Sequence, residues 1–246
     1  MNTLDILVIG FILLVVLLKS LISYLIAKKR TERFKDIALN RGLLFEDDAQ
    51  TLKDELQSGR ICFSFFKQGS SSQPENCLCG VRFGRFSADF FDYSYIDSGS
   101  RHSRKYNYRC GLVRFPSEIC LPQFELVPEY FFMRLRDSIF GLDIDFDEHP
   151  LFSEKYQLTA YRDSEESYRL AQEEYIRKLF QPSVIACFEK YTGLEAYSKA
   201  NFLLVCKYGL MKIEETEEFE NAVREISEII YSAYQSNLEY FRSMQA

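Results

Sequence analysis

The side chains best suited to chemistry gather between positions 143 and 149, where acidic and apolar residues alternate. The polar members are Asp143, Asp145, Asp147, Glu148 and His149. On an extended strand the three aspartates would project from one face, and grouped carboxylates bind hard divalent cations. The spacing makes Asp143, Asp145, Asp147 and His149 candidate metal ligands, and a metal-dependent enzyme is one interpretation of the chain.

The same segment imitates a calcium-binding loop but departs from it at critical points. The three aspartates match positions 1, 3 and 5 of such a loop, and Glu154 matches position 12. Position 6 is Glu148, where the loop requires glycine, and position 8 is Pro150. A strand with a solvated acidic face is the simpler interpretation, and we expect no calcium loop.

The remaining reactive residues form no recognised catalytic pattern. The only histidines are His102 and His149, and the pair Cys77-x-Cys79 lacks the spacing of common zinc sites. The chain has no Gly-x-Ser-x-Gly, Walker A or Gly-x-Gly-x-x-Gly motif. Its cysteines number seven, and several lie in apolar runs, which indicates free thiols in a reducing compartment. We expect no cofactor.

The charge distribution argues against a nucleic-acid partner. Residues 1–30 hold four basic side chains and one acidic side chain, so of 30 basic and 36 acidic residues 26 and 35 remain in 31–246, a net charge of −9. An acidic domain gains little from phosphate contacts. The one basic patch after the first helix is Arg101-His102-Ser103-Arg104-Lys105. It is interpreted as a solvated loop, with contact to anionic lipid headgroups as the alternative.

The N-terminal segment is typical of a membrane-spanning helix. Its apolar run covers about residues 6–27, interrupted by Lys19 and serines, and about 22 residues at 1.5 Å each match a bilayer core. Lys19 lies close enough to the interface for its side chain to snorkel. The expected anchor residues are Ile6, Leu13 and Leu18 in the apolar run and Lys28, Lys29 and Arg30 in the basic flank.

The charges around this segment predict its orientation. A signal peptide carries its positive charge before the apolar run, whereas here only Asp5 precedes the run and the basic residues follow it. This asymmetry favours a C-terminal side in the cytoplasm. We therefore expect an anchor over 1–30 and a cytoplasmic α+β domain over 31–246, with a sub-boundary near residue 160 as the alternative to one domain.

The rest of the chain predicts an antiparallel sheet followed by C-terminal helices. The segment 85–95 is strand-like, because the apolar Phe86, Ala88 and Phe90 alternate with the polar Arg85, Ser87 and Asp89. Near the C-terminus, apolar residues recur at spacings of three and four. The expected helices are 31–42, 49–57, 163–180, 182–191 and 217–241; the expected strands are 61–67, 77–83, 85–95, 106–115, 122–127, 194–197 and 201–207, with a polar loop at 69–74.

Three stretches of the sequence resemble a widespread, uncharacterised bacterial family. They are Phe91-Asp92-Tyr93-Ser94-Tyr95, Leu121-Pro122-Gln123-Phe124-Glu125-Leu126 and Asp143-Ile144-Asp145-Phe146-Asp147-Glu148-His149-Pro150-Leu151-Phe152-Ser153. The resemblance implies a short N-terminal membrane anchor followed by an intracellular α+β domain. It brings no activity and no site residue to this chain.

These observations favour a membrane-tethered binding or scaffold module over an enzyme. The expected partners are the lipid bilayer and another protein, with no nucleic acid. The expected location is a bacterial inner membrane, crossed once, with the C-terminal domain in the cytoplasm. The alternative is a metal-dependent enzyme that uses the acidic cluster 143–149.

Overall fold

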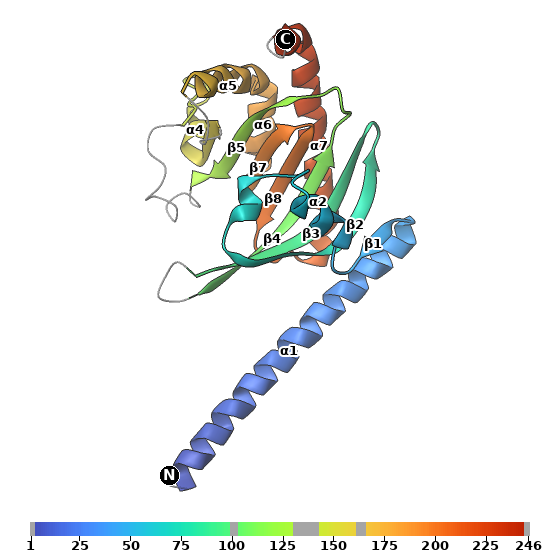
Figure 1. Ribbon diagram of the computed structural model, residues 1–246, viewed down its shortest axis with the longest axis vertical. Helices are drawn as coiled ribbons and strands as arrows, with labels where there is room; N and C mark the ends of the chain where they lie inside the picture. Colours follow the sequence, from blue (N-terminus) through green and yellow to red (C-terminus); the bar gives the residue numbers. More distant parts are fainter. Residues whose placement is uncertain (1–2, 99–102, 130–142, 161–165, 244–246) are drawn as a thin grey trace.

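The computed structural model describes residues 3–98, 103–129, 143–160 and 166–243. Its most prominent element is α1 (Thr3–Arg41), a single helix of 39 residues that projects away from the rest of the molecule (Figure 1). Gly42 follows the helix with a φ of 63°, a left-handed conformation that glycine adopts without strain. The helix expected at 31–42 is therefore the continuation of the apolar segment, and α1 runs unbroken through the expected boundary at residue 30.

The N-terminal part of α1 is long and apolar enough to cross a membrane. Its apolar side chains stand free of the domain: Leu13 is 57% exposed and Leu18 48%. The Ile6 side chain lies outside the described residues, although its backbone is helical. Lys28 and Lys29 are exposed as well, so α1 first meets the domain at Arg30.

The domain is built on one eight-stranded antiparallel sheet, which confirms the α+β class. Strands from both sides of position 160 interleave in this sheet, because the pair from 194–208 lies between β4 and β5. In spatial order the strands are β1 (Leu44–Glu46), β2 (Ser70–Phe83), β3 (Phe86–Asp97), β4 (Arg104–Arg114), β8 (Phe202–Tyr208), β7 (Leu194–Ala200), β5 (Leu121–Pro128) and β6 (Tyr156–Ala160).

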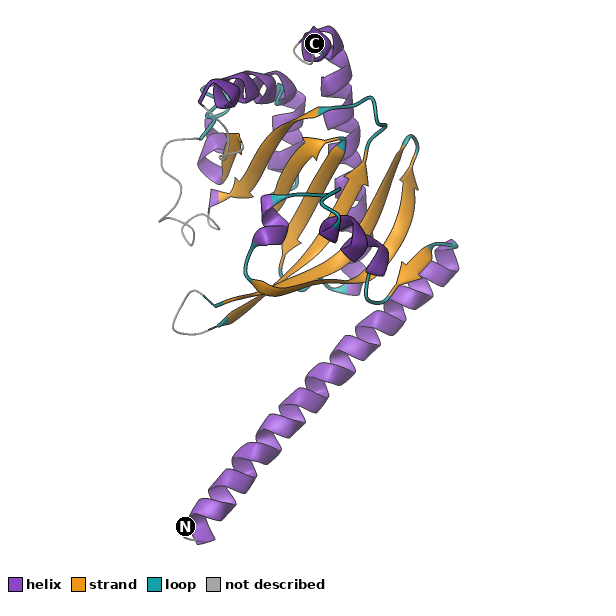
Figure 2. Cartoon of the chain, viewed as in Figure 1, coloured by secondary structure: helices purple, strands orange, loops and turns teal. Residues whose placement is uncertain are grey.

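One face of the sheet is covered by helices. The end of α1 contributes Phe34 and Ala38 to this core, and α7 crosses behind the sheet (Figure 2). Gly111 on β4 makes the close approach of α7 possible, since an added Cβ would lie 2.9 Å from the Phe90 ring and 3.1 Å from Val223. In the described part of the chain the α-helices after α1 are α2 (Gln50–Gln57), α4 (Pro150–Lys155), α5 (Glu166–Leu179), α6 (Pro182–Lys190), α7 (Thr216–Ser236) and α8 (Leu238–Ser243).

The expected C-terminal helix is present as α7, followed after Asn237 by the short α8. Its apolar stripe faces the core: Val223, Ile226 and Ile230 are at most 1% exposed. Glu228 and Gln235 on the opposite side are exposed. The stripe therefore completes the hydrophobic core, as its periodicity indicates.

The other face of the sheet is covered by the segment between β1 and β2. Phe65 in the 3₁₀ helix η1 (Ser64–Lys67) packs its ring against Tyr93, Tyr108 and Tyr197, with centroids 5.0 to 5.4 Å apart. The expectation of a strand at 61–67 is wrong because this aromatic run lies across the sheet and does not pair with it. Both faces of β3 and β4 are consequently buried.

Two further expectations are corrected. The polar stretch 69–74 belongs mostly to β2, which pairs with β3 from Ser70 onward. It is polar because β1 pairs with β2 only at Cys77–Cys79, so this part of β2 forms an exposed edge of the sheet. The short elements β1, α4 and β6 were not expected. The first three residues of the helix expected at 163–180 lie outside the described residues.

Candidate functional site at the junction of α1 and the sheet

The end of α1 is joined to the sheet by an ion pair between Arg30 and Asp92 on β3. Arg30 Nε lies 2.7 Å from Asp92 Oδ2 and Arg30 Nη2 lies 2.8 Å from Oδ1, a two-bond arrangement in which each side chain is only 11% exposed. Arg30 Nη1 also donates to the carbonyl oxygen of Met211. Arg30 was expected only as a flanking charge, but it bonds to β3 and to the loop that contains Met211.

Hydrogen bonds extend this contact to β2. Asn76 Nδ2 donates to Asp92 Oδ2 at 3.0 Å, and Thr31 Oγ1 donates to Asn76 Oδ1 at 2.8 Å. Asp92 is nevertheless mostly buried, and burial alone would raise its pKa. The hydrogen bonds and positive charge of Arg30, together with the charge of Arg109, outweigh burial and hold the pKa of Asp92 below its ordinary value.

Arg109 on β4 lies completely buried beneath α1. Its Nη1 lies 3.3 Å from Asp92 Oδ1, and its guanidinium carbon lies 4.3 Å from the centre of the Phe34 ring. Its Nε and Nη2 have no hydrogen-bond partner among the described residues. Burial lowers the pKa of Arg109, and the charge of Asp92 opposes that shift. Asp92 therefore neutralises two arginines, and α1 covers the second one.

Beyond Arg30, the last turns of α1 form one wall of a cleft whose other walls are β2 and the first turns of α7. The cleft has a volume of about 550 Å³. Arg41 at the end of α1 makes a two-bond ion pair with Glu220 on α7, at 2.8 and 3.1 Å. Val81 and Phe83 supply apolar surface on the β2 side.

The cleft contains a buried polar group without a partner. Thr216, the first residue of α7, is 3% exposed and lines the cleft, and its Oγ1 has no hydrogen bond among the described residues. A buried hydroxyl without a partner costs about 1 to 3 kcal/mol. Arg82 on β2 and both Glu217 and Arg224 on α7 also line the cleft, so an occupant would meet both signs of charge and an unpaired hydroxyl.

The acidic segment 143–149 takes a different form from the one expected. Asp143 makes a single bridge to Thr159, and residues 144–149 form no strand. The Asp143 carboxylate accepts a hydrogen bond from the Leu158 backbone, and burial raises its pKa to about 6. Asp145, Asp147 and Glu148 are exposed, and His149 precedes α4. In the part of the chain that the structure describes, no three His, Cys, Asp or Glu side chains are grouped to hold a metal ion.

The cysteines are free thiols, and four of them are buried. Cys77 and Cys79 lie on one face of β2 with their sulfurs 3.4 Å apart, because residues two positions apart on a strand point to the same side. Cys110 and Cys206 are opposite one another on β4 and β8, and their sulfurs are 3.0 Å apart. Burial raises the pKa of Cys110, so this pair is neutral core packing.

A second buried carboxyl lies on the aromatic face of the sheet. Glu195 on β7 is 1% exposed, and the Tyr197 hydroxyl donates to it at 2.8 Å. Burial raises the pKa of Glu195 to about 7. Its partner Tyr197 lines a cavity of only about 10 Å³, which is too small for a ligand.

The residues of the junction were missed from sequence, with the exception of Arg30. The available signal was Asp92 and Arg109, two charges inside otherwise aromatic strands. Such charges are rarely buried without a partner, but sequence alone names no partner. Comparisons with known protein families, with curated proteins and with solved structures find no match to this chain.

Proposed function

We propose that the chain is a single-pass membrane protein whose cytoplasmic domain is a binding module, and that the cleft between α1, β2 and α7 is its binding site. The apolar surface of α1, which no described part of the domain covers, supports the tether. Lys28 and Lys29 follow that surface and favour a cytoplasmic domain. The bonds of Arg30 to Asp92 and Met211 support a domain that keeps a fixed orientation relative to α1.

The observation that carries the binding site is the hydroxyl of Thr216. It is buried, has no hydrogen-bond partner among the described residues and lines the cleft of about 550 Å³. Valine has nearly the same shape and would avoid the cost of the buried hydroxyl. Stability alone therefore gives no reason for threonine at this position, whereas an occupant that bonds to the hydroxyl does.

The occupant that fits best is an extended segment of a partner protein. β1 pairs with β2 only as far as Cys79, so no described strand covers the edge of β2 from Gly80 to Phe83. A peptide can add to such an edge through backbone hydrogen bonds while its side chains enter an adjacent cleft. Arg82 and Arg224 would meet its acidic groups, and Glu217 its basic ones.

The test is site-specific photo-crosslinking in native membranes, using the full chain. A photoreactive residue replaces Arg82 in the cleft or, as a control, the exposed Glu154 on α4. We expect one defined adduct from position 82 that is absent from position 154. A second variant, Asn221→Trp, fills the cleft from its rim and should abolish that adduct. Equal adducts from both positions, or an adduct that survives Asn221→Trp, would reject the site.

A further inference from the structure

The bonds of Arg30 determine which edge of the domain lies next to the apolar helix. The apolar run of α1 ends at about Ala27, and Arg30 follows three residues later, about 4.5 Å along the axis at 1.5 Å per residue. Arg30 Nη1 donates to the carbonyl of Met211. The loop between β8 and η2 (Ile213–Glu215) therefore lies at the level where the apolar surface of α1 gives way to charge.

This loop exposes the residue types that favour a membrane interface. Leu210 is 58% exposed, although its neighbour Met211 is buried, and Tyr208 at the end of β8 is 39% exposed. Lys212 is exposed beside them. Aromatic, aliphatic and basic side chains in combination are typical of surfaces that rest at the headgroup level of a bilayer.

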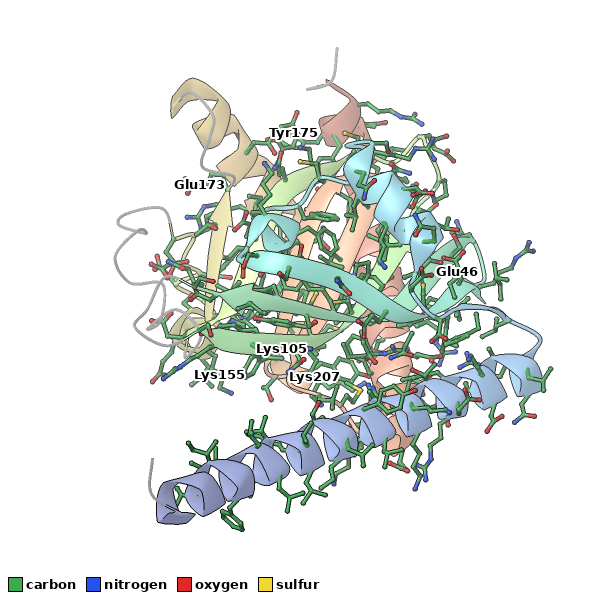
Figure 3. All side chains as sticks on the ribbon, turned by 60° about the horizontal axis from the view of Figure 1, so that its bottom comes forward. Glu46, Lys105, Lys155, Glu173, Tyr175 and Lys207 are labelled. Atoms are coloured by element: carbon green, nitrogen blue, oxygen red, sulfur yellow. The ribbon has the colours of Figure 1, made fainter. Side chains whose placement is uncertain are left out.

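Basic residues on β4 extend the same edge. Tyr108 pairs with Tyr208, so the earlier residues of β4 continue past the end of β8, and both Arg104 and Lys105 are exposed there. Figure 3 shows Lys105 and Lys207 on the face along which α1 passes. Lys207 lines a small cavity together with Glu215 and Glu218, so acidic side chains lie close to its charge.

We propose that Tyr208, Leu210 and Lys212, together with Arg104 and Lys105, form a second membrane contact, here called the loop surface. Leu210 enters the boundary between headgroups and acyl chains, and the basic residues contact the phosphates of anionic lipids. The domain thereby lies against the bilayer instead of standing away from it on α1. This inference rests on the proposed function in one respect, namely that α1 spans the membrane.

The net charge of the domain limits which of its surfaces can approach an anionic leaflet. Residues 31–246 carry a net charge of −9, since 26 basic and 35 acidic residues remain after the first 30 are set aside. A domain of that charge is repelled by an anionic leaflet unless its basic residues face the lipid. The acidic neighbours of these basic residues include Asp97, which pairs with Arg104 in the register of β3 and β4, and the exposed Glu214, whose charge interacts with Lys212. Lys105 and Lys212 are therefore the residues whose reversal should matter most.

The absence of tryptophan from the sequence allows a direct test with the full chain. Single tryptophans are placed at Leu210 in the loop surface, at Leu13 in the apolar helix, and at Leu39, an 81% exposed position on α1 beyond the junction. Each variant is reconstituted in vesicles that contain anionic phospholipid, with or without brominated acyl chains. We expect quenching and a blue-shifted emission for Leu13→Trp and Leu210→Trp, and neither for Leu39→Trp.

The three positions separate the two proposals. Quenching at position 13 without quenching at position 210 would overturn the loop surface and leave the tether intact. No quenching at position 13 would overturn the tether itself. Adding Lys105→Glu and Lys212→Glu to Leu210→Trp should reduce its quenching in anionic vesicles. The matched control, Lys67→Glu with Arg242→Glu, changes the same charge at other exposed positions and should leave the quenching unchanged; equal loss in both would reject lipid contact by these two lysines.

Discussion

Arg30 on α1 and Asp92 on β3 form a two-bond ion pair, and Asp92 at the same time faces the fully buried Arg109. One carboxylate thus neutralises a charge from the helix and a charge from the sheet. The helix completes the site, because Phe34 covers the Arg109 guanidinium at 4.3 Å. The position of α1 relative to the sheet is therefore coupled to the stability of the core.

The first prediction concerns this shared carboxylate. Asp92→Asn keeps the shape of the side chain but removes the carboxylate that pairs with Arg30 and with the buried Arg109, so we expect a loss of about 3 to 5 kcal/mol in the free energy of unfolding. Chemical unfolding of the full chain in detergent measures it. The control is Glu214→Gln, which breaks the exposed pair with Arg33 and should cost at most about 1 kcal/mol. Equal effects of the two substitutions would contradict the junction.

The second prediction tests Thr216. Thr216→Val removes the unpartnered hydroxyl and should raise the free energy of unfolding by about 1 kcal/mol. The same substitution should weaken the photo-crosslink from position 82, because the occupant loses a bonding partner. Thr51→Val on α2 is the control, since the Thr51 hydroxyl is bonded to Glu46 and its loss should not stabilise the protein. A stabilised Thr216→Val variant with an undiminished crosslink would show that the hydroxyl serves no occupant.

The third prediction concerns the packing of α7 on the sheet. Ile226 is 1% exposed, and Ile226→Ala should lower the free energy of unfolding by about 2 to 5 kcal/mol through lost burial and a residual cavity. Glu228→Ala, two residues away on the exposed side, should change it by no more than about 0.5 kcal/mol. Thermal or chemical melts of the two variants give the comparison. A loss below about 1 kcal/mol for Ile226→Ala would mean that the stripe does not form part of the core.

The fourth prediction follows from Glu195. Burial raises its pKa from 4.5 to about 7, so the folded state binds this proton more tightly than the unfolded state. The associated stability is complete below about pH 4.5 and is lost as the pH rises through about 7, a change on the order of 3 kcal/mol. Glu195→Gln should remove that loss and leave the variant more stable than the native chain at pH 8.

Unfolding curves at pH 5 and pH 8 measure the difference, with the exposed Glu228→Gln as control. Parallel pH profiles for the native chain and Glu195→Gln would refute the assignment.

The elements with a strong local signal could be predicted from the sequence. The apolar run of α1, the helical stripe of α7 and the alternation in β3 each follow from the periodicity of one segment. The helix expected at 182–191 begins at Pro182, where proline is well tolerated.

The junction could not be predicted because its contacts join residues far apart in the chain. Arg30 and Asp92 are separated by 62 residues, and the sequence indicates only that Arg30 carries a charge. The segment 61–67 shows the opposite error: its aromatic residues favour a strand locally, but Phe65 packs across the finished sheet. The acidic run 143–149 looked most like a site because carboxylates were close in sequence, whereas the structure exposes Asp145 and Asp147 and bonds Asp143 to β6.

The central claim is that α1 anchors the domain in a membrane with the domain on the cytoplasmic side. Protease accessibility of the full chain in sealed inside-out and right-side-out vesicles tests the orientation, and carbonate extraction of a separate portion of the same membranes tests the anchor. We expect the protein to stay in the pellet after carbonate extraction, and its domain to be digested in inside-out vesicles and protected in right-side-out vesicles. Release by the carbonate wash, or digestion only in right-side-out vesicles, would contradict it.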